Sequence, residues 1–166
     1  MLWLDWVRVG QDPIPHHRLL QENESYRSPH YRLRMDRMRI LLADHHSETL
    51  WALKTRFGEE PGIELIGETS EAEALLELAK ASLVDLILMD GELPGRPVEI
   101  LIADLHNLVP KPKVVVMSSN PEYGRKYLKA GADAFVSKTD QPEWLFETLR
   151  KSAKYPNKEA NNVNSG

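Results

Sequence analysis

The sequence predicts an α/β fold in which a five-stranded parallel sheet carries helices on both faces. Between residues 38 and 153, five short apolar segments alternate with five segments of helical periodicity, and short joints connect them. The segment at 114–117 is apolar throughout and rich in β-branched valine, which is typical of a strand covered on both faces. No segment repeats another, so the alternation indicates βα units of one sheet.

The five strands are expected at 39–43, 63–68, 86–89, 114–117 and 134–137. The first three helices are marked by apolar residues on one side, namely Leu50, Leu53 and Phe57, then Leu75, Leu76 and Ala79, then Leu101, Leu105 and Leu108. Ser70 and Glu73 have the spacing of a capping box, in which each side chain bonds the other residue's backbone N–H. They predict the start of the second helix.

The last two helices carry signals at their ends. Asn120 is a good cap and Pro121 fits the first helical position, so the pair predicts a helix start. Gly131 stands where that helix should end, because glycine tolerates the left-handed backbone of a helix terminus. Pro142 begins the fifth helix.

The chain of 166 residues has room for one domain and two extensions. Residues 1–37 keep neither helical nor strand periodicity for long, so we expect an irregular and disordered arm there. An arm that docks Trp3 and Trp6 on the core is the alternative. The domain itself is expected at 38–153, followed by a disordered polar tail at 154–166.

Composition limits the classes of function. The net charge of −4 does not favour nucleic acid or an anionic membrane as a partner. The absence of cysteine excludes disulfides, thiolate zinc sites and cysteine nucleophiles. No apolar run approaches the roughly 18 residues of a membrane span, and the start of the chain, interrupted by Asp5, lacks the basic segment of a signal peptide. We therefore expect a cytoplasmic protein without direct contacts to nucleic acid or membrane.

Polar residues follow four of the predicted strands. Asp44 comes after the first strand and Asp90 after the third, while Ser118 and Lys138 follow the fourth and fifth. In an open parallel sheet, functional groups gather at the carboxyl ends of the strands, near the switch in strand order. Any one of these residues could simply end its strand in solvent, but four together indicate a site with two carboxylates, a hydroxyl and an ammonium group.

These groups suit phosphoryl transfer. Two neighbouring carboxylates repel each other, and a hard divalent ion such as Mg²⁺ relieves the repulsion by binding carboxylate, carbonyl and water oxygens. The ion and the Lys138 ammonium could then neutralise a phosphoryl group while a carboxylate attacks phosphorus.

Four segments resemble the response-regulator receiver domain of two-component signalling: ILLAD at 40–44, DLILMDGELPG at 85–95, VVVMSS at 114–119 and GADAFVSK at 131–138. The segment EPGIELIGE at 60–68 is closest in style to receivers that precede LuxR-type DNA-binding domains. The resemblance implies a (βα)5 flavodoxin-like fold with strand order 2-1-3-4-5. Because no such DNA-binding segment follows in this sequence, we expect a stand-alone receiver.

The resemblance assigns roles to individual residues. Asp90 matches the phospho-acceptor, and Lys138 matches the lysine that pairs with the phosphoryl group. Ser118 matches the switch hydroxyl that turns inward to bond that group, and Phe135 matches the aromatic residue that changes rotamer with it.

The resemblance also implies a Mg²⁺ site built from Asp44, Asp90 and the backbone carbonyl of Glu92. Receivers usually carry a second acid where this chain has His45. Imidazole suits transition metals better, so binding should be weak or shifted toward Mn²⁺ or Zn²⁺ unless the Glu92 carboxylate supplies the lost acid. His45 could equally be a spectator. Adjacent histidines on an extended chain point apart, so His45 and His46 are not expected to share one ion.

The function implied by the resemblance is that of a signalling phosphoprotein. It would receive a phosphoryl group from the phosphohistidine of a sensor histidine kinase or phosphotransfer protein and signal by conformational change, without turning over an outside substrate. One alternative is a pseudo-receiver that acts without phosphorylation, for which His45 is the evidence. Another is a small α/β phosphohydrolase, against which the sequence shows no lid-sized insertion and no glycine-rich phosphate loop.

Partner contacts are expected on the face formed by the fourth helix, fifth strand and fifth helix, where a downstream protein or a second copy would bind. The fourth helix carries an aromatic and basic mixture, namely Tyr123, Arg125, Lys126, Tyr127 and Lys129. An ordinary solvated helix face is the other interpretation. Trp51 and Trp144 could mark the side on which a kinase docks, although tryptophan is also common in amphipathic packing.

Overall fold

All five predicted strands are present and pair in parallel in the computed structural model, which describes residues 37–152. The sheet has the predicted order β2-β1-β3-β4-β5. Its strands are β1 (Met38–Ala43), β2 (Ile63–Thr69), β3 (Leu86–Asp90), β4 (Lys113–Ser118) and β5 (Ala134–Ser137). The predictions for the arm at 1–37, apart from residue 37, and for the tail at 154–166 lie outside the described residues.

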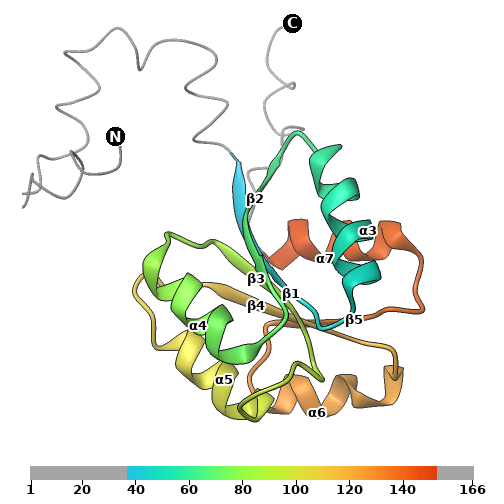
Figure 1. Ribbon diagram of the computed structural model, residues 1–166. Coiled ribbons are helices and arrows are strands. Elements are labelled where there is room, and N and C mark those ends of the chain that lie inside the picture. Colours follow the sequence, from blue (N-terminus) through green and yellow to red (C-terminus); the bar gives the residue numbers. More distant parts are fainter. Residues whose placement is uncertain (1–36, 153–166) are drawn as a thin grey trace, which may run out of the picture. The chain divides into compact units, whose positions relative to one another are not determined.

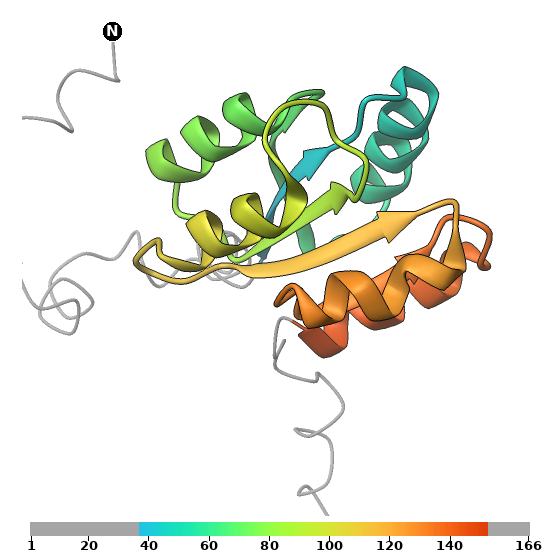
Figure 2. The ribbon, with the colours of Figure 1, turned by 90° about the horizontal axis from the view of Figure 1, so that it is seen from below.

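Helices cover both faces of the sheet, as predicted (Figures 1 and 2). One face carries α3 (Ser47–Gly58) and α7 (Pro142–Ser152). The other carries α4 (Ala72–Ala81), α5 (Val98–His106) and α6 (Gly124–Lys129), the last preceded by the short 3-10 helix η2 (Pro121–Tyr123). Within the described part of the chain, no helix is both long and apolar enough to cross a membrane.

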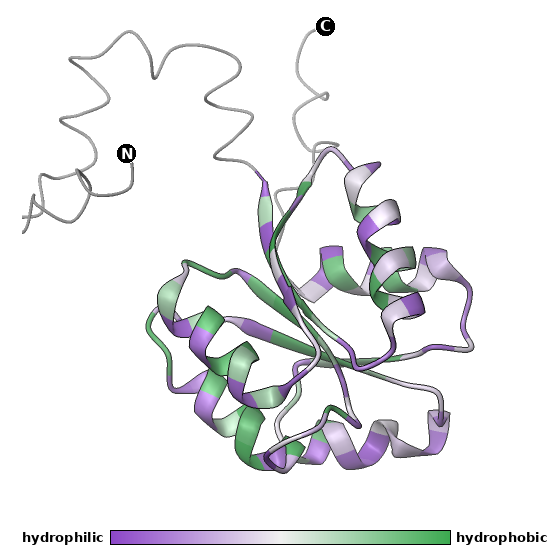
Figure 3. Ribbon diagram, in the orientation of Figure 1, coloured by the Kyte–Doolittle hydropathy of each residue, from purple (hydrophilic) through white to green (hydrophobic). Residues whose placement is uncertain are grey.

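The core consists of two apolar layers separated by the sheet, and apolar residues line the inner sides of the helices (Figure 3). Strand β1 shows the division, because Leu41 packs toward α4 and α5 whereas Ile40 and Leu42 pack toward α3 and α7. All five residues of β3 are buried. The central strands are therefore fixed from both faces, and so are the residues at their ends.

The helix signals are confirmed in part. Asn120 Oδ1 accepts a hydrogen bond from the Glu122 N–H at 3.0 Å, and Gly131 has a φ of 106° beyond the end of α6. The capping box is wrong: α4 has Glu71 at its N-cap and no capping bond from a side chain. The Glu73 carboxylate instead accepts a hydrogen bond from the backbone N–H of Arg96 at 3.2 Å, so it anchors the loop after β3.

Tyr127 is buried, contrary to the prediction that it belongs to an exposed surface of the fourth helix. Only 1% of the residue is exposed, and its ring stacks on Phe135 with centroids 6.1 Å apart. Burial raises the pKa of the Tyr127 hydroxyl, and the nearby carboxylates of Glu92 and Asp90 raise it further. On its other side the phenol ring lies so close to Gly91 that a Cβ atom there would overlap it.

Gly91→Ala should destabilise the domain by about 1–3 kcal/mol, because the rigid Tyr127 ring cannot give way to the added methyl group. Urea-induced unfolding measures this loss. Adding Tyr127→Leu should recover part of the lost stability, because the smaller side chain no longer overlaps the added methyl group. Gly58→Ala is the matched control, because no atom lies within 4 Å of a Cβ there. Equal effects at the two glycines would contradict the packing argument.

Asp133 ties α5, β4 and β5 together just before β5 begins. Its carboxylate accepts hydrogen bonds from the Val114 N–H at 2.8 Å and Lys113 Nζ at 2.9 Å, and it lies 2.9 Å from His106 Nε2. Burial alone would raise the pKa of Asp133, but these hydrogen bonds outweigh burial and lower it.

Asp133→Asn should lower the free energy of unfolding at pH 7 by about 1–2 kcal/mol, because the amide can still accept from Val114 but loses the charge that faces Lys113. A lowered native pKa contributes stability above the unfolded-state pKa of about 3.9, and this contribution is lost as the pH falls through the native value. The difference in unfolding free energy between wild type and variant should therefore begin to shrink at about pH 4 and disappear only below the native pKa of Asp133. A difference that does not change with pH would contradict this assignment.

Candidate functional site at the carboxyl edge of the sheet

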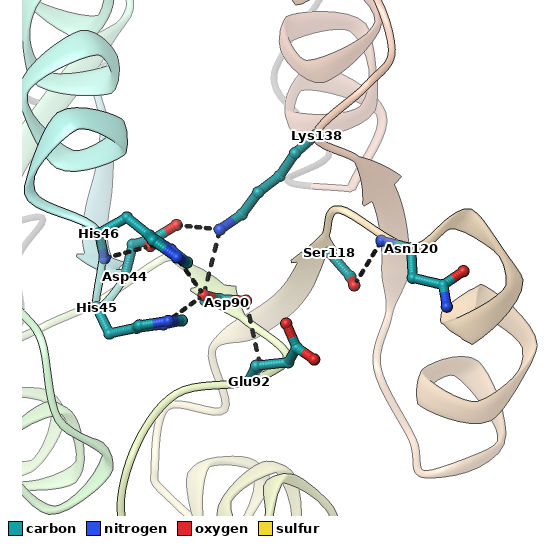
Figure 4. A network of polar contacts seen from close by, with 8 residues as sticks. All are labelled: Asp44, His45, His46, Asp90, Glu92, Ser118, Asn120 and Lys138. Atoms are coloured by element: carbon teal, nitrogen blue, oxygen red, sulfur yellow. Dashed lines mark hydrogen bonds and ion pairs between the residues drawn. The ribbon is translucent and has the colours of Figure 1, made fainter.

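The four polar residues predicted to converge lie at the carboxyl ends of neighbouring strands (Figure 4). Asp44 directly follows β1, and Asp90 is the last residue of β3, which pairs with β1. Ser118 ends β4, and Lys138 directly follows β5. Asp44 and Asp90 are 0% and 1% exposed, so the site contains two carboxylates withdrawn from water.

Lys138 joins these two carboxylates. Its Nζ lies 2.6 Å from Asp44 Oδ2 and 3.2 Å from Asp90 Oδ2. Strand β5 is two strands away from β3 in the sheet, so the long lysine side chain carries a positive charge across to the acids. This contact opposes the repulsion between two buried carboxylates.

His45 and His46 both turn toward the carboxylates, and the prediction that adjacent histidines point apart is wrong. His45 Nδ1 lies 2.8 Å from Asp90 Oδ2, and His46 Nδ1 lies 3.0 Å from Asp44 Oδ1 and 3.7 Å from Asp90 Oδ2. The chain bends at His45, and the His46 backbone N–H donates to Asp44 Oδ1 at 2.8 Å across this bend. The two rings therefore come together, with centroids 3.7 Å apart.

The two oxygens of Asp90 have different surroundings. Oδ1 accepts a hydrogen bond from the Glu92 backbone N–H at 3.1 Å. Oδ2 has Lys138 and both histidines within ion-pairing distance, but none of them forms a hydrogen bond of proper geometry with it. A buried carboxylate oxygen without a hydrogen bond is costly, so this atom is suited to binding an electrophile or a cation.

Ser118 lies at the same edge of the sheet as the acids, and the side chains of Ser118 and Phe135 both contact other residues. Ser118 Oγ accepts a hydrogen bond from the Asn120 N–H at 3.1 Å, and the side chain lies on the other side of Asp90 from the histidines (Figure 4). Phe135 is half-buried against Tyr127. The switch roles expected for these two residues would therefore require them to exchange their present contacts.

The donors that could bind one metal ion are Asp44, His45, His46 and Asp90, whose ligand atoms all lie within 4.8 Å of one another. The structure does not bring the exposed side chain of Glu92 into this group. Sequence reasoning considered His46 and rejected it as a ligand, because two adjacent histidines were expected to point apart. What the sequence did not reveal was the bend at His45 that turns both rings inward.

This donor set does not fit the Mg²⁺ site expected from the sequence. Mg²⁺ requires near-octahedral oxygen ligands and retains several of its waters. Two of the four donors here are imidazole nitrogens, which suit transition metals. Only two carboxylates face the position where an ion would sit.

Comparisons with known proteins agree with the fold. Residues 40–150 match the response regulator receiver domain family. The nitrate/nitrite response regulator NarL of Escherichia coli (strain K12) is 33% identical over 116 residues, which cover 69% of this chain and 54% of NarL. The chain thus spans about half the length of the curated relatives that it matches.

Solved receiver structures share the fold. The receiver domain of the response regulator NarL from Mycobacterium tuberculosis superposes with a TM-score of 0.65 at 23% identity, covering 71% of this chain and 97% of that one. A CheY-like receiver from Methanospirillum hungatei JF-1 gives 0.61 at 26% identity, covering 71% and 94%. The strand order, the acids at its switch point and the family match over 40–150 lead to one conclusion: the chain belongs to the response regulator receiver domain family.

Proposed function

We propose that this receiver domain accepts a phosphoryl group from the phosphohistidine of a sensor histidine kinase or phosphotransfer protein, and that Asp90 is the acceptor. Receiver domains act in signalling through such phosphotransfer. The observation that carries the proposal is Asp90 Oδ2, a buried carboxylate oxygen without a hydrogen bond, 3.2 Å from the Lys138 ammonium.

In the proposed step, an Asp90 oxygen forms a bond to phosphorus while the P–N bond of the donor breaks. The electron pair of that bond stays on the donor imidazole, which then takes up a proton. Charge on the transferring group is spread over its oxygens, and a positioned cation stabilises it. Lys138 suits this task because its ammonium already lies beside Asp90.

Signalling would follow from the change of charge at Asp90. A phosphoryl group offers new acceptor oxygens, and Ser118 Oγ could bond one of them after releasing the Asn120 N–H. Phe135 and Tyr127 pack next to this position, so a shift of Ser118 would repack the face made by α6, β5 and α7.

Partner binding on that face is supported by the side chains that α6 and η2 expose. With Tyr127 buried, the exposed aromatic, apolar and basic residues are Tyr123, Arg125, Lys126, Leu128 and Lys129. Trp51 on α3 and Trp144 on α7 are 71% and 61% exposed. A pocket of about 440 Å³ lies between those two helices, and its apolar lining is suited to a docking kinase.

Several finer expectations remain predictions. They are the stand-alone arrangement, the cytoplasmic location, the absence of nucleic-acid and membrane contacts, and the dependence on Mg²⁺. Receivers generally bind Mg²⁺ at an acidic pocket, and the mixed acid and histidine cluster here is a departure from that composition.

Incubation of the full chain with phosphoramidate or acetyl phosphate and a divalent ion should add one phosphoryl group, detected by intact mass spectrometry. Asp90→Asn should abolish the addition, because the amide is not a nucleophile. Asp85→Asn is the matched control at the opposite end of β3, where Asp85 pairs with Arg39. Phosphorylation that survives Asp90→Asn would refute Asp90 as the acceptor.

A pseudo-receiver that acts without phosphorylation is the second candidate, and one observation favours it. His45 Nδ1 lies 2.8 Å from Asp90 Oδ2, so the ring lies next to the oxygen that would attack phosphorus. His45 stands at the position where receivers of this type usually carry a second acid.

His45→Asp separates the two candidates. If His45 merely slows the reaction, the variant should take up the phosphoryl group faster than wild type and with greater dependence on Mg²⁺, because a third carboxylate restores oxygen ligands. Time courses by intact mass measure both rates. An inert wild type with an active His45→Asp variant would support the pseudo-receiver, and uptake that is equal in both would show that His45 is a spectator.

A further inference from the structure

We propose that Asp44, His45, His46 and Asp90 bind a single divalent transition-metal ion, with Zn²⁺ strongly preferred over Mg²⁺. The proposal does not depend on phosphoryl transfer. It follows from the mismatch between these four donors and a site for a hard, oxygen-seeking ion.

The spacing of the donors suits one small ion. Zinc binds histidine nitrogen and carboxylate oxygen at about 2.0–2.2 Å, usually with four ligands in a tetrahedron. Donor atoms around such an ion are then roughly 3.4 Å apart. The four ligand atoms here all lie within 4.8 Å of one another, and the pairs between imidazole and carboxylate span 2.8, 3.0 and 3.7 Å. Small side-chain movements would place all four around one centre.

Asp90 Oδ2 points independently to a missing cation. It belongs to a residue that is 1% exposed, and it has no hydrogen bond of proper geometry although Lys138 Nζ lies at 3.2 Å and both histidines face it. A bound ion would supply the partner that this oxygen lacks. Oδ1 of the same carboxylate accepts the Glu92 N–H, which holds the side chain in place.

Lys138 and the proposed ion would share Asp90 Oδ2, because Lys138 Nζ lies 3.2 Å from that oxygen. Asp44 presents Oδ2 to Lys138 and Oδ1 to His46, so the two oxygens of one carboxylate serve opposite sides. Figure 4 shows Lys138 reaching the acids from β5, whereas both histidine rings lie on the side of β1. The side chains of His45 and His46 are 31% and 51% exposed, which gives an ion access from solvent.

The preference for zinc follows from the donor types. Affinity of nitrogen and oxygen sites rises from Mn²⁺ to Cu²⁺ and falls again at Zn²⁺, and imidazole is a good ligand for zinc whereas Mg²⁺ prefers oxygen ligands. Two neutral imidazoles with two carboxylates balance the charge of one dication, and the Lys138 ammonium leaves one positive charge that a third acid would balance. Exchange of one histidine for an acid should therefore shift the preference back toward Mg²⁺.

The test uses the full chain without an affinity tag and without any phosphoryl donor. Isothermal titration with Zn²⁺ and with Mg²⁺ measures stoichiometry and affinity, and Co²⁺ titration reports four-coordinate binding through its visible absorption. Wild type should bind one Zn²⁺ much more tightly than Mg²⁺. His45→Asp and His46→Gln should each weaken zinc by at least about tenfold, and His45→Asp should also strengthen Mg²⁺.

The double variant His16→Gln/His17→Gln is the matched control, because it removes the other adjacent histidine pair of the sequence. It should bind zinc as wild type does, and circular dichroism should show that every variant is folded. The proposal is overturned if the control loses zinc, if both site variants keep it, or if wild type binds none because Lys138 and imidazolium neutralise the acids. Phosphorylation of Asp90 is measured separately, so failure of one proposal leaves the other standing.

Discussion

Two buried carboxylates held side by side constrain the functional edge of this domain. Asp44 and Asp90 end adjacent central strands that are packed from both faces, so neither acid can move away from the other. Buried charges of like sign are strongly unfavourable unless cations or hydrogen bonds compensate them. Lys138, His45 and His46 all approach these two groups, and the edge is organised around that compensation.

The sequence was sufficient to predict the sheet and the residues at its edge, because both follow from periodicity. Alternating apolar strands and amphipathic helices determine a parallel sheet, and the carboxyl ends of parallel strands share one side. Asp44, Asp90, Ser118 and Lys138 could therefore be placed at one edge from their positions alone, although the contacts that each one makes could not. Which carboxylate oxygen faces which positively charged group depends on side-chain torsion angles, and the hydrophobic pattern of the sequence does not predict these angles.

The errors arose where the local backbone departs from regular geometry. A bend after β1, closed by the His46 N–H on Asp44, turned two histidines together that an extended chain would have separated. Tyr127 was grouped with Arg125 and Lys129 on one exposed surface, although residues two apart in an α-helix lie on nearly opposite sides, and α6 contains all three. Glu73 had the spacing of a cap, but the loop at Arg96 offered its carboxylate a competing partner.

Asp90 Oδ2 is the atom at which the proposed phosphoryl transfer and the proposed metal binding would meet. The other oxygen of Asp90 is committed to the Glu92 N–H, so an incoming phosphoryl group and a bound cation would compete for one position unless the carboxylate turns. In a site with a second acid, that acid can coordinate the cation, and the oxygen that would accept the phosphoryl group stays uncoordinated. With His45 there instead, the cation must rely more on Asp90 itself. On these two proposals, a histidine in place of one acid would change how a single carboxylate is shared as well as which metal is preferred.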